Sequence, residues 1–266
     1  ILVLKFGGTS VGSVDLIKSA AKIIKNEYDA GANIAVAVSA MSGTTNSLIK
    51  NIDLISSKDD AEYDSIVASG EQVAAGLMAL ALQELNVPAR SWLGWQLPIY
   101  TSGTHRYATI SKIESKNILE GFKKKEVAVV AGFQGISLDG RITTIGRGGT
   151  DNTAVFLASA INAERCDIYT DVDGVYTADP RIVDNVKRLD KVSYEEMIEM
   201  ASQGAKVLQT TSVESAINHN VKLQVRSTFD PDNKGTLISE DIQSNEQHAV
   251  TGVAYSKDEA KITIIN

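Results

Sequence analysis

The sequence predicts an α/β protein in which a mainly parallel β-sheet lies between layers of helices. Strand-like apolar runs alternate with helical patterns along the chain, and several of these runs are apolar at every position. A parallel strand needs a crossover connection, usually a helix, and a strand that is covered on both faces is apolar throughout. The repeated strand–helix–strand order therefore favours a mainly parallel sheet with helices on both sides.

The individual elements follow this pattern along the chain. Apolar residues at helical spacing run over 14–24, and the alanine-rich segment 65–85 is predicted as one helix. Ser193 and Glu196 have the spacing of a capping box, and Gly204 follows where that helix should end. Strands are predicted over 1–6, 34–38, 127–131, 141–145 (in a hairpin that begins at Asp139), 166–170 and 221–225, and further helices over 153–161 and 211–219.

The C-terminal end of the sequence differs from the rest. Two strands are predicted over 248–255 and 260–265, joined by the polar turn 256–259. A lone hairpin is at best marginally stable in water. We therefore expect one domain over residues 1–244 and the start of a second, truncated domain over residues 245–266.

Composition excludes several classes of protein. Of the 266 residues 43% are hydrophobic and 22% charged, and the formal net charge is -7. A nucleic-acid binder usually carries a basic face, whereas the basic run at 123–125 is short and is interpreted as a solvated helix end. Cys166 is the only cysteine, so no disulfide can form within the chain, and we expect a buried, inert thiol. No signal peptide opens the chain and no uninterrupted apolar stretch reaches membrane-spanning length, which favours the cytoplasm.

Two segments rich in glycine or hydroxyl side chains lie at the ends of the first two predicted strands. Residues 5–10 place Lys5 ahead of the turn Gly7-Gly8, where backbone amides can approach a phosphate and the lysine can lie against it. This segment lacks the Walker A and dinucleotide patterns, and a purely structural turn is an alternative. Residues 39–46 are rich in hydroxyls that could anchor a small polar substrate, or they could simply cap the next helix.

A third segment, residues 146–153, has an unusual combination of side chains. Arg147 can bind a carboxylate through two parallel hydrogen bonds. Gly148 and Gly149 allow close backbone approach, and Asp151 can hold an ammonium group or orient a lysine. We interpret the segment as a site for an α-amino acid, whose two charges need opposite partners. The alternative is a helix cap without a ligand.

A fourth segment, residues 170–181, follows a strand end and is rich in turn-forming residues. The Tyr176 ring could provide a surface for a nucleotide, and Arg181 could contact its phosphates. The alternative is a long polar loop with no binding function.

Taken together, these segments resemble the aspartate kinases of the amino acid kinase family. The resemblance covers about residues 1–240, and the tail resembles the start of the regulatory ACT domains of that family. It rests on seven motifs in the family's order, namely KFGGTS at 5–10, SAM at 39–41, SGE at 69–71, GFQG at 132–135, GRGGTD at 146–151, TDVDGVYTADPR at 170–181 and GAKVLQ at 204–209.

The resemblance implies a three-layer αβα sandwich and an activity. An aspartate kinase transfers the γ-phosphate of ATP to the β-carboxylate of L-aspartate, giving 4-phospho-L-aspartate, the first step towards lysine, threonine and methionine. Mg²⁺ would be held mainly by the ATP phosphates, with no protein ligand assigned. A homo-oligomer, regulatory ACT subunits and feedback control by lysine or threonine are also implied.

The family's functional residues carry over position by position. Thr150 replaces a more usual serine but keeps the hydroxyl, and Thr211 stands where related sequences often carry arginine. The catalytic residues would be Lys5 and Asp151; the substrate site would comprise Ser39, Thr45, Glu71, Phe133, Arg147, Gly148, Gly149 and Thr150; the nucleotide site would comprise Lys5, Phe6, Gly7, Gly8, Thr170, Asp171, Tyr176, Arg181 and Lys206.

Two other functions remain open from the sequence. The chain could be an amino acid kinase that acts on glutamate, N-acetylglutamate, carbamate or UMP, although Arg147 and Glu71 favour a free α-amino acid. It could also be a catalytically silent amino-acid sensor, against which the presence of Lys5, Asp151 and Lys206 argues.

Overall fold

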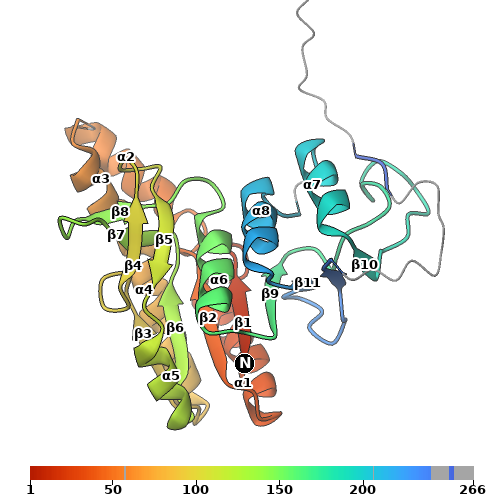
Figure 1. Ribbon diagram of the computed structural model, residues 1–266, viewed down its shortest axis with the longest axis horizontal. Coiled ribbons are helices and arrows are strands. Elements are labelled where there is room, and N and C mark those ends of the chain that lie inside the picture. Colours follow the sequence, from red (N-terminus) through yellow and green to blue (C-terminus); the bar gives the residue numbers. More distant parts are fainter. Residues whose placement is uncertain (57, 206, 241–251, 255–266) are drawn as a thin grey trace, which may run out of the picture.

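Two β-sheets and the helices around them make up the fold, in a computed structural model that describes residues 1–56, 58–205, 207–240 and 252–254 (Figure 1). The strands are β1 (Leu2–Phe6), β2 (Ile34–Val38), β3 (Ala89–Trp92), β4 (Ile99–Ser102), β5 (Thr109–Ile113), β6 (Val127–Ala131), β7 (Gln134–Ile136), β8 (Ile142–Thr144), β9 (Arg165–Thr170), β10 (Lys191–Val192), β11 (Leu223–Ser227) and β12 (Thr236–Ile238). The helices are α1 (Val14–Asp29), α2 (Thr44–Ile55), α3 (Asp60–Val67), α4 (Ser69–Glu84), α5 (Lys116–Lys123), α6 (Gly149–Ala160), α7 (Tyr194–Ser202) and α8 (Thr210–His219).

The larger sheet has the strand order β10-β12-β11-β9-β1-β2-β6-β3. Its neighbouring strands run parallel, except for the antiparallel pair β11 and β12. The predicted mainly parallel sheet is therefore confirmed. The smaller sheet, with the order β5-β4-β7-β8, lies beside the β3 and β6 side of the molecule (Figure 1).

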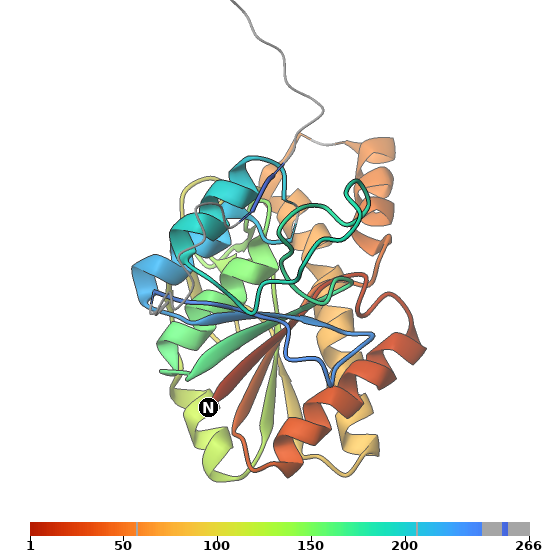
Figure 2. The ribbon, with the colours of Figure 1, turned by 90° about the vertical axis from the view of Figure 1, so that its right-hand side faces the viewer.

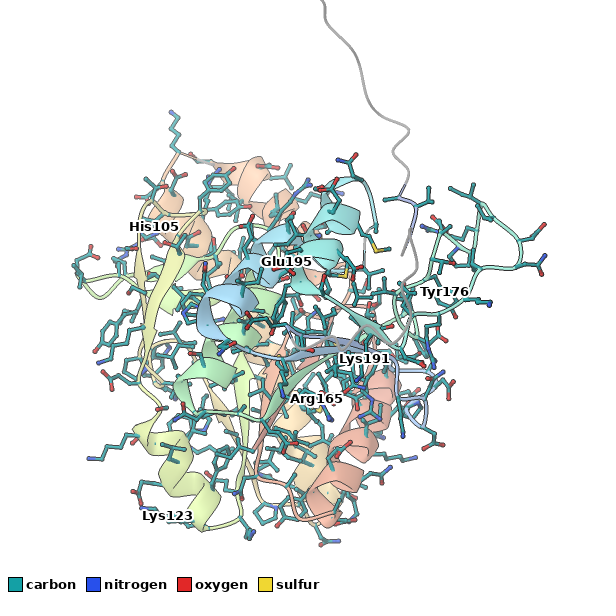
Figure 3. All side chains as sticks on the ribbon, turned by 45° about the vertical axis from the view of Figure 1, so that its right-hand side comes forward. His105, Lys123, Arg165, Tyr176, Lys191 and Glu195 are labelled. Atoms are coloured by element: carbon teal, nitrogen blue, oxygen red, sulfur yellow. The ribbon has the colours of Figure 1, made fainter. Side chains whose placement is uncertain are left out.

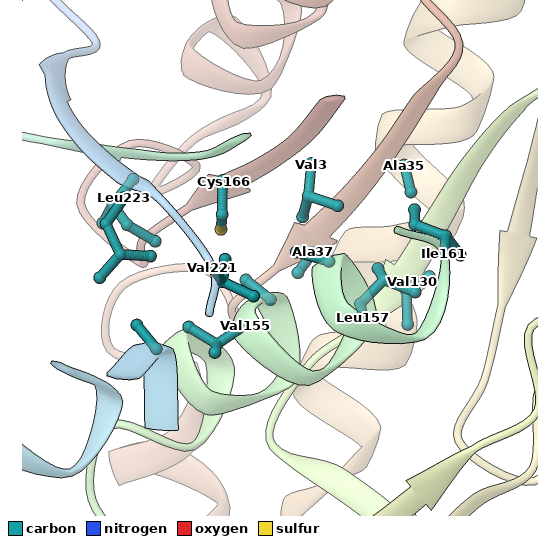
Figure 4. Close-up of a cluster of buried hydrophobic side chains, with 14 of the residues drawn as sticks. Val3, Ala35, Ala37, Val130, Val155, Leu157, Ile161, Cys166, Val221 and Leu223 are labelled. Atoms are coloured by element: carbon teal, nitrogen blue, oxygen red, sulfur yellow. The ribbon is translucent and has the colours of Figure 1, made fainter. Parts of the chain in front are cut away.

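Helices cover both faces of the larger sheet, as the αβα sandwich requires (Figure 2). Successive side chains of a strand point to opposite faces. On β1, Leu4 and Phe6 enter a core with α1 and α4, while Val3 enters a second core with α6 and α8. Figure 4 shows the second core, where Val3 lies opposite Leu157 of α6. This double burial explains why the central strands are apolar at every position.

Several elements differ from the sequence-based prediction. The predicted helix 65–85 is two helices, α3 and α4, which meet at Ala68. The predicted helix 153–161 begins four residues earlier, because Gly148 adopts a left-handed conformation at the N-cap of α6. The sequence predicts no bounds for α2, although a helix after the segment 39–46 is one alternative there, and the only buried residue of α2 is Ile52.

Other predictions are confirmed by the structure. The capping box of α7 is present, with Ser193 and Glu196 each accepting from the other residue's backbone N–H. Cys166 is fully buried, and burial raises the pKa of its thiol well above the ordinary value, so it is not a reactive thiolate.

The helical stretch Asp60–Glu84, which combines α3 and α4, is long and apolar enough to cross a membrane by length and composition alone. Half of its most apolar window is buried inside the protein. The inner face of α4, including Met78 and Leu82, belongs to the core beneath the sheet. A core helix passes the same test, and we interpret the stretch as one.

The predicted C-terminal strands fall largely outside the described residues. Of that region the structure describes residues 252–254, where the backbone N–H of Val253 donates to the carbonyl of Thr177 at 2.7 Å. The domain boundary near residue 245 stays a prediction.

A buried carboxylate joins α3 to the smaller sheet. Asp64 is fully buried and accepts hydrogen bonds from His105 Nδ1 at 2.7 Å, from the backbone N–H of Arg106 at 3.1 Å, and from the Thr144 hydroxyl. Nearby, Asp60 pairs with the Arg106 guanidinium at 2.8 Å but has a half-exposed side chain. Because Asp64 is buried, it should stabilise the fold more than Asp60 does. Buried donors that lose their acceptor cannot form a hydrogen bond with water instead.

We therefore expect Asp64→Ala to lower the free energy of unfolding by about 3 kcal/mol, since it leaves buried donors unsatisfied. Asp60→Ala is the matched control on the same helix and should cost less than about 1 kcal/mol, as for other exposed ion pairs. Urea unfolding of both variants provides the measurement. Equal costs for the two variants would show that Asp64 is not the anchor.

Candidate functional site

A cavity of about 420 Å³ opens where β1, β2 and β6 end. In an open α/β sheet, ligands bind beyond the carboxyl ends of the parallel strands. The cavity brings together many of the residues singled out in the sequence, although they span almost 150 positions of the chain. Those that line it are Lys5, Gly8, Ser39, Thr45, Glu71, Phe133, Arg147, Gly148, Gly149, Thr150 and Asp151.

Three helices begin at this cavity without a side-chain cap at the N-terminus. The N-cap residues of α2, α6 and α8 are Gly43, Gly148 and Gln209; each lines the cavity, and none forms a side-chain cap. Among the other helices, Ser13 caps α1 and Ser193 caps α7 through their side chains, whereas α4 and α5 also lack a side-chain cap. Uncapped N–H groups and the positive ends of helix dipoles favour anions. The cavity is therefore built for negatively charged groups.

An ion pair between Lys5 and Asp151 lies in the wall of the cavity. Lys5 comes from β1 and Asp151 from the first turn of α6, and the distance between Lys5 Nζ and Asp151 Oδ1 is 2.7 Å. Their side chains are only 11% and 13% exposed. A side chain at Gly7 would place its Cβ 3.1 Å from Lys5 Nζ, so glycine leaves room for the ammonium group. Asp151 thereby holds the Lys5 ammonium group at a fixed point beside the turn Gly7-Gly8.

Glu71 supplies a second carboxylate to the cavity. It lies in the first turn of α4 and is 4% exposed. Its Oε1 accepts the backbone N–H of Ala40 at 3.1 Å, whereas its Oε2 is buried without a partner among the described residues. Burial raises the pKa of Glu71 to about 7, partly opposed by the Ala40 hydrogen bond. The unpaired oxygen is suited to accept from a cationic ligand group.

Arg147 is the free cation of the site. It lines the cavity just before Gly148, and its exposed guanidinium forms no ion pair within the described part of the chain. On the same hairpin, Arg141 pairs with Glu62 at 2.7 Å outside the cavity. A guanidinium that is left unpaired at an anion-binding cavity is available for a ligand carboxylate.

Backbone strain fixes Phe133 in the cavity wall. Its φ of 63° is unusual for a bulky residue. Its backbone N–H donates to Thr153 Oγ1 at 3.2 Å, and its carbonyl accepts from Ile145. A Cβ at Gly149 would lie 2.6 Å from the Phe133 ring, so glycine is needed there. The strained conformation is held from several sides, as is common at binding sites.

The expected nucleotide residues are less tightly grouped. Tyr176 lies on the loop after β9, on the side of the molecule away from His105, and its hydroxyl donates to Asp173 at 3.0 Å (Figure 3). Arg181, on the same loop, is 81% exposed and pairs with Asp179. Thr170 and Asp171 follow β9 directly and are joined by a hydrogen bond. None of these four side chains lines the described cavity.

Phe6 requires a correction. Its side chain is fully buried and stacks on Tyr169, with ring centroids 4.8 Å apart. The ring therefore belongs to the core, and only the backbone of Phe6 can reach a ligand. Lys206 lies outside the described residues. Among the residues that the structure describes, no three His, Cys, Asp or Glu side chains are grouped to hold a metal ion.

Some cavity residues were not selected from the sequence. Ser42 and Gly43 belong to the hydroxyl-rich segment 39–46, where the signal was present but not residue-specific. Gln209 comes from another part of the chain. It packs against Gly148 on the side where other residues carry a Cβ, and a Cβ there would lie 2.9 Å from Gln209 Cγ. Only the packing of α8 beside α6 brings it there. The complete set that was missed is Ala40, Met41, Ser42, Gly43, Gly146 and Gln209.

Known proteins similar to this chain share its fold and much of its sequence. An aspartate kinase of Pseudomonas fluorescens is 49% identical over 99% of this chain, which spans 65% of that relative. Among solved structures, the aspartate kinase from Synechocystis superposes with a TM-score of 0.80 at 40% identity, covering 91% of this chain and 40% of that one. Escherichia coli aspartokinase III, solved in complex with aspartate and ADP, gives the same TM-score at 30% identity, covering 91% and 65%.

The chain spans just under two thirds of the length of the aspartate kinases of Pseudomonas that it matches. A model of the amino acid kinase family matches residues 1–227, which is most of the sequence and includes every described part of the cavity. The αβα fold, the cavity at the strand ends and this match agree, and the chain belongs to the amino acid kinase family.

Proposed function

We propose that this protein is an aspartate kinase, which transfers the γ-phosphate of ATP to the β-carboxylate of L-aspartate. The main support is one cavity that presents a free guanidinium and a buried carboxylate with an unpaired oxygen, beside a fixed lysine. An α-amino acid needs opposite partners for its carboxylate and its ammonium group, and Arg147 and Glu71 provide them. The name and bound ligands of aspartokinase III add further support.

The mechanism requires no general base. The side chain of aspartate has an ordinary pKa of about 3.9, so it is ionised at neutral pH and can attack the γ-phosphorus directly. The new bond forms between a β-carboxylate oxygen and phosphorus, and the bond to the ADP oxygen breaks. The main obstacle is repulsion between two anions. Fixed positioning and positive charge are therefore what the protein must supply.

Each part of the cavity has a role in this proposal. Arg147 binds the α-carboxylate and Glu71 the α-ammonium, which orients the β-carboxylate. The Lys5 ammonium neutralises charge on the transferring phosphate, and Asp151 holds Lys5 in place. The uncapped N-termini of α2, α6 and α8 add positive potential around the anionic groups.

ATP would extend from Lys5 and Gly8 across the end of β9 toward the loop that carries Tyr176 and Arg181. Mg²⁺ would enter with the phosphates and neutralise part of their charge. Lys5 and the backbone amides at the uncapped helix N-termini could hold the phosphates that carry the metal, and no protein ligand to Mg²⁺ is assigned. A homo-oligomer, regulation through ACT domains and a cytoplasmic location also belong to this proposal.

An assay with a panel of phosphate acceptors can distinguish an aspartate kinase from another amino acid kinase and from a silent sensor. ADP release should be measured with aspartate, glutamate, N-acetylglutamate, carbamate and UMP, each with ATP and Mg²⁺. We expect turnover with aspartate well above that with the other acceptors. Turnover with a different acceptor would make this another amino acid kinase, and aspartate binding without turnover would make it a sensor.

Lys5→Met should lower kcat by about 10²–10³-fold, because it removes a fixed charge that acts in the transition state. Aspartate affinity should change only a few-fold, since Lys5 does not contact the α-groups in this proposal. Steady-state kinetics and calorimetry measure the two quantities. Lys25→Met, at a solvent-exposed ion pair on α1, is the matched control and should leave both unchanged. Near-normal turnover of the Lys5 variant would refute the role.

Arg147→Ala should cost about 2–5 kcal/mol of aspartate binding, because the α-carboxylate loses its charged partner. The effect should fall on KM for aspartate more than on KM for ATP. Arg141→Ala removes a guanidinium from the same hairpin but outside the cavity, and should leave KM unchanged. Unaltered aspartate affinity in the Arg147 variant would exclude the assignment.

Glu71→Gln should change stability and binding in opposite directions. The folded-state pKa of Glu71 is raised from 4.5 to about 7, so the folded protein loses stability as pH rises from about 4.5 to 7 and the buried carboxyl ionises. At pH 8 the variant lacks this buried charge and should be more stable by about 3 kcal/mol, with little gain at pH 5.

The same variant should bind aspartate about tenfold more weakly at pH 8, because a neutral amide replaces the carboxylate that meets the ammonium group. In the unaltered protein, KM for aspartate should rise as pH falls below about 7, and this rise should be absent in the variant. Thermal melts and kinetics across pH provide the measurements. A variant that is destabilised at pH 8, with unchanged affinity, would contradict both expectations.

A further inference from the structure

A second cavity, of about 470 Å³, lies at the β3 edge of the larger sheet, beside α5. It shares no lining residue with the cavity at the strand ends. Figure 1 shows α5 at the end of the molecule opposite α2 and α3, which agrees with this separation. Its volume is within the range of sites that bind small molecules. The inference drawn from it is independent of the proposed kinase activity.

A tryptophan in this cavity has a buried donor without an acceptor. Trp92 is 4% exposed, and its Nε1 is buried with no hydrogen-bond partner among the described residues. The guanidinium of Arg90 lies 3.9 Å from the centre of the Trp92 ring, which fixes the two side chains against each other. Buried donors are nearly always satisfied, and leaving one unsatisfied is unfavourable. An acceptor from a ligand would complete the site.

Charges of both signs surround this indole. Arg90 and Lys124 line the cavity, and neither forms an ion pair within the residues that the structure describes. Glu126 also lines it and makes no ion pair there, whereas Glu120 is paired with Lys123 at 2.7 Å. The lining charges that have no partner among the described residues are therefore two cations and one carboxylate. A ligand that carries one charge of each sign finds an opposite partner for both of its charges in this lining.

We propose that the cavity between β3 and α5 binds a free α-amino acid. Its carboxylate accepts from Trp92 Nε1 and pairs with Arg90 and Lys124, and its ammonium group pairs with Glu126. A simple carboxylate would leave Glu126 facing another anion, and a simple amine would leave the indole donor and both cations without a partner.

The chain provides its own reporter for this site. It has two tryptophans, and Trp95 lies outside both cavities. In a Trp95→Phe background, the emission of Trp92 should change saturably when glycine, aspartate or lysine is added, and calorimetry should give the same dissociation constant. Arg90→Ala and Lys124→Ala should each weaken binding about tenfold, the loss expected when a charge-assisted hydrogen bond is removed. Lys116→Ala, on the same helix but outside the cavity, should have no effect.

Further controls test whether the ligand binds in this cavity and whether it must carry both charges. Arg147→Ala should leave the Trp92 response unchanged, because Arg147 belongs to the other cavity. Succinate and ethylamine, which each lack one of the two charges, should bind at least tenfold more weakly than glycine. The proposal is overturned if emission and calorimetry stay flat with all three amino acids, if the Arg90 and Lys124 variants bind normally, or if succinate binds as well as glycine.

Discussion

The position of Lys5 on a strand buried on both faces is the constraint from which the site is built. Side chains of β1 alternate between two cores, so Lys5 must follow Val3 to the α6 side, where Ala37 and Ile168 are its neighbours in register. A largely buried ammonium group needs a partner. Asp151, in the first turn of α6, provides it at 2.7 Å. The ion pair thereby fixes α6 against β1 at the edge where the cavity opens.

The same helix carries the rest of the substrate wall. Gly148, in the left-handed conformation, starts α6 without a side-chain cap, and Arg147 precedes it on the chain. The orientation of α6 therefore sets the positions of the Lys5 ion pair, the uncapped helix N-terminus and the guanidinium together. Gln209, at the start of α8, closes this wall because α8 packs along α6. A shift of α6 relative to the sheet would displace all of these groups at once.

The cavity retains groups that an optimally stable protein would avoid. Glu71 holds a buried oxygen without a partner, Phe133 has positive φ, and three helix N-termini lack side-chain caps. Each of these features costs stability in the free protein. Elsewhere the chain uses side-chain caps at Ser13 and Ser193 and a satisfied buried carboxylate at Asp64. At the cavity, these unsatisfied polar groups lie where a ligand would satisfy them.

The sequence by itself determined the alternation of strands and helices, because continuous apolar runs report burial on both faces and helical spacing reports burial on one. It also indicated which short segments carry the cavity, since glycines, hydroxyls and an arginine at strand ends have few other uses together. Only the tertiary structure decided which of those residues meet. It brought Gln209 beside Gly148, turned the Phe6 ring into the core and left the Glu71 oxygen unpaired. These outcomes depend on how α4, α6 and α8 pack on the sheet, and local sequence patterns carry no information about contacts between such distant parts of the chain.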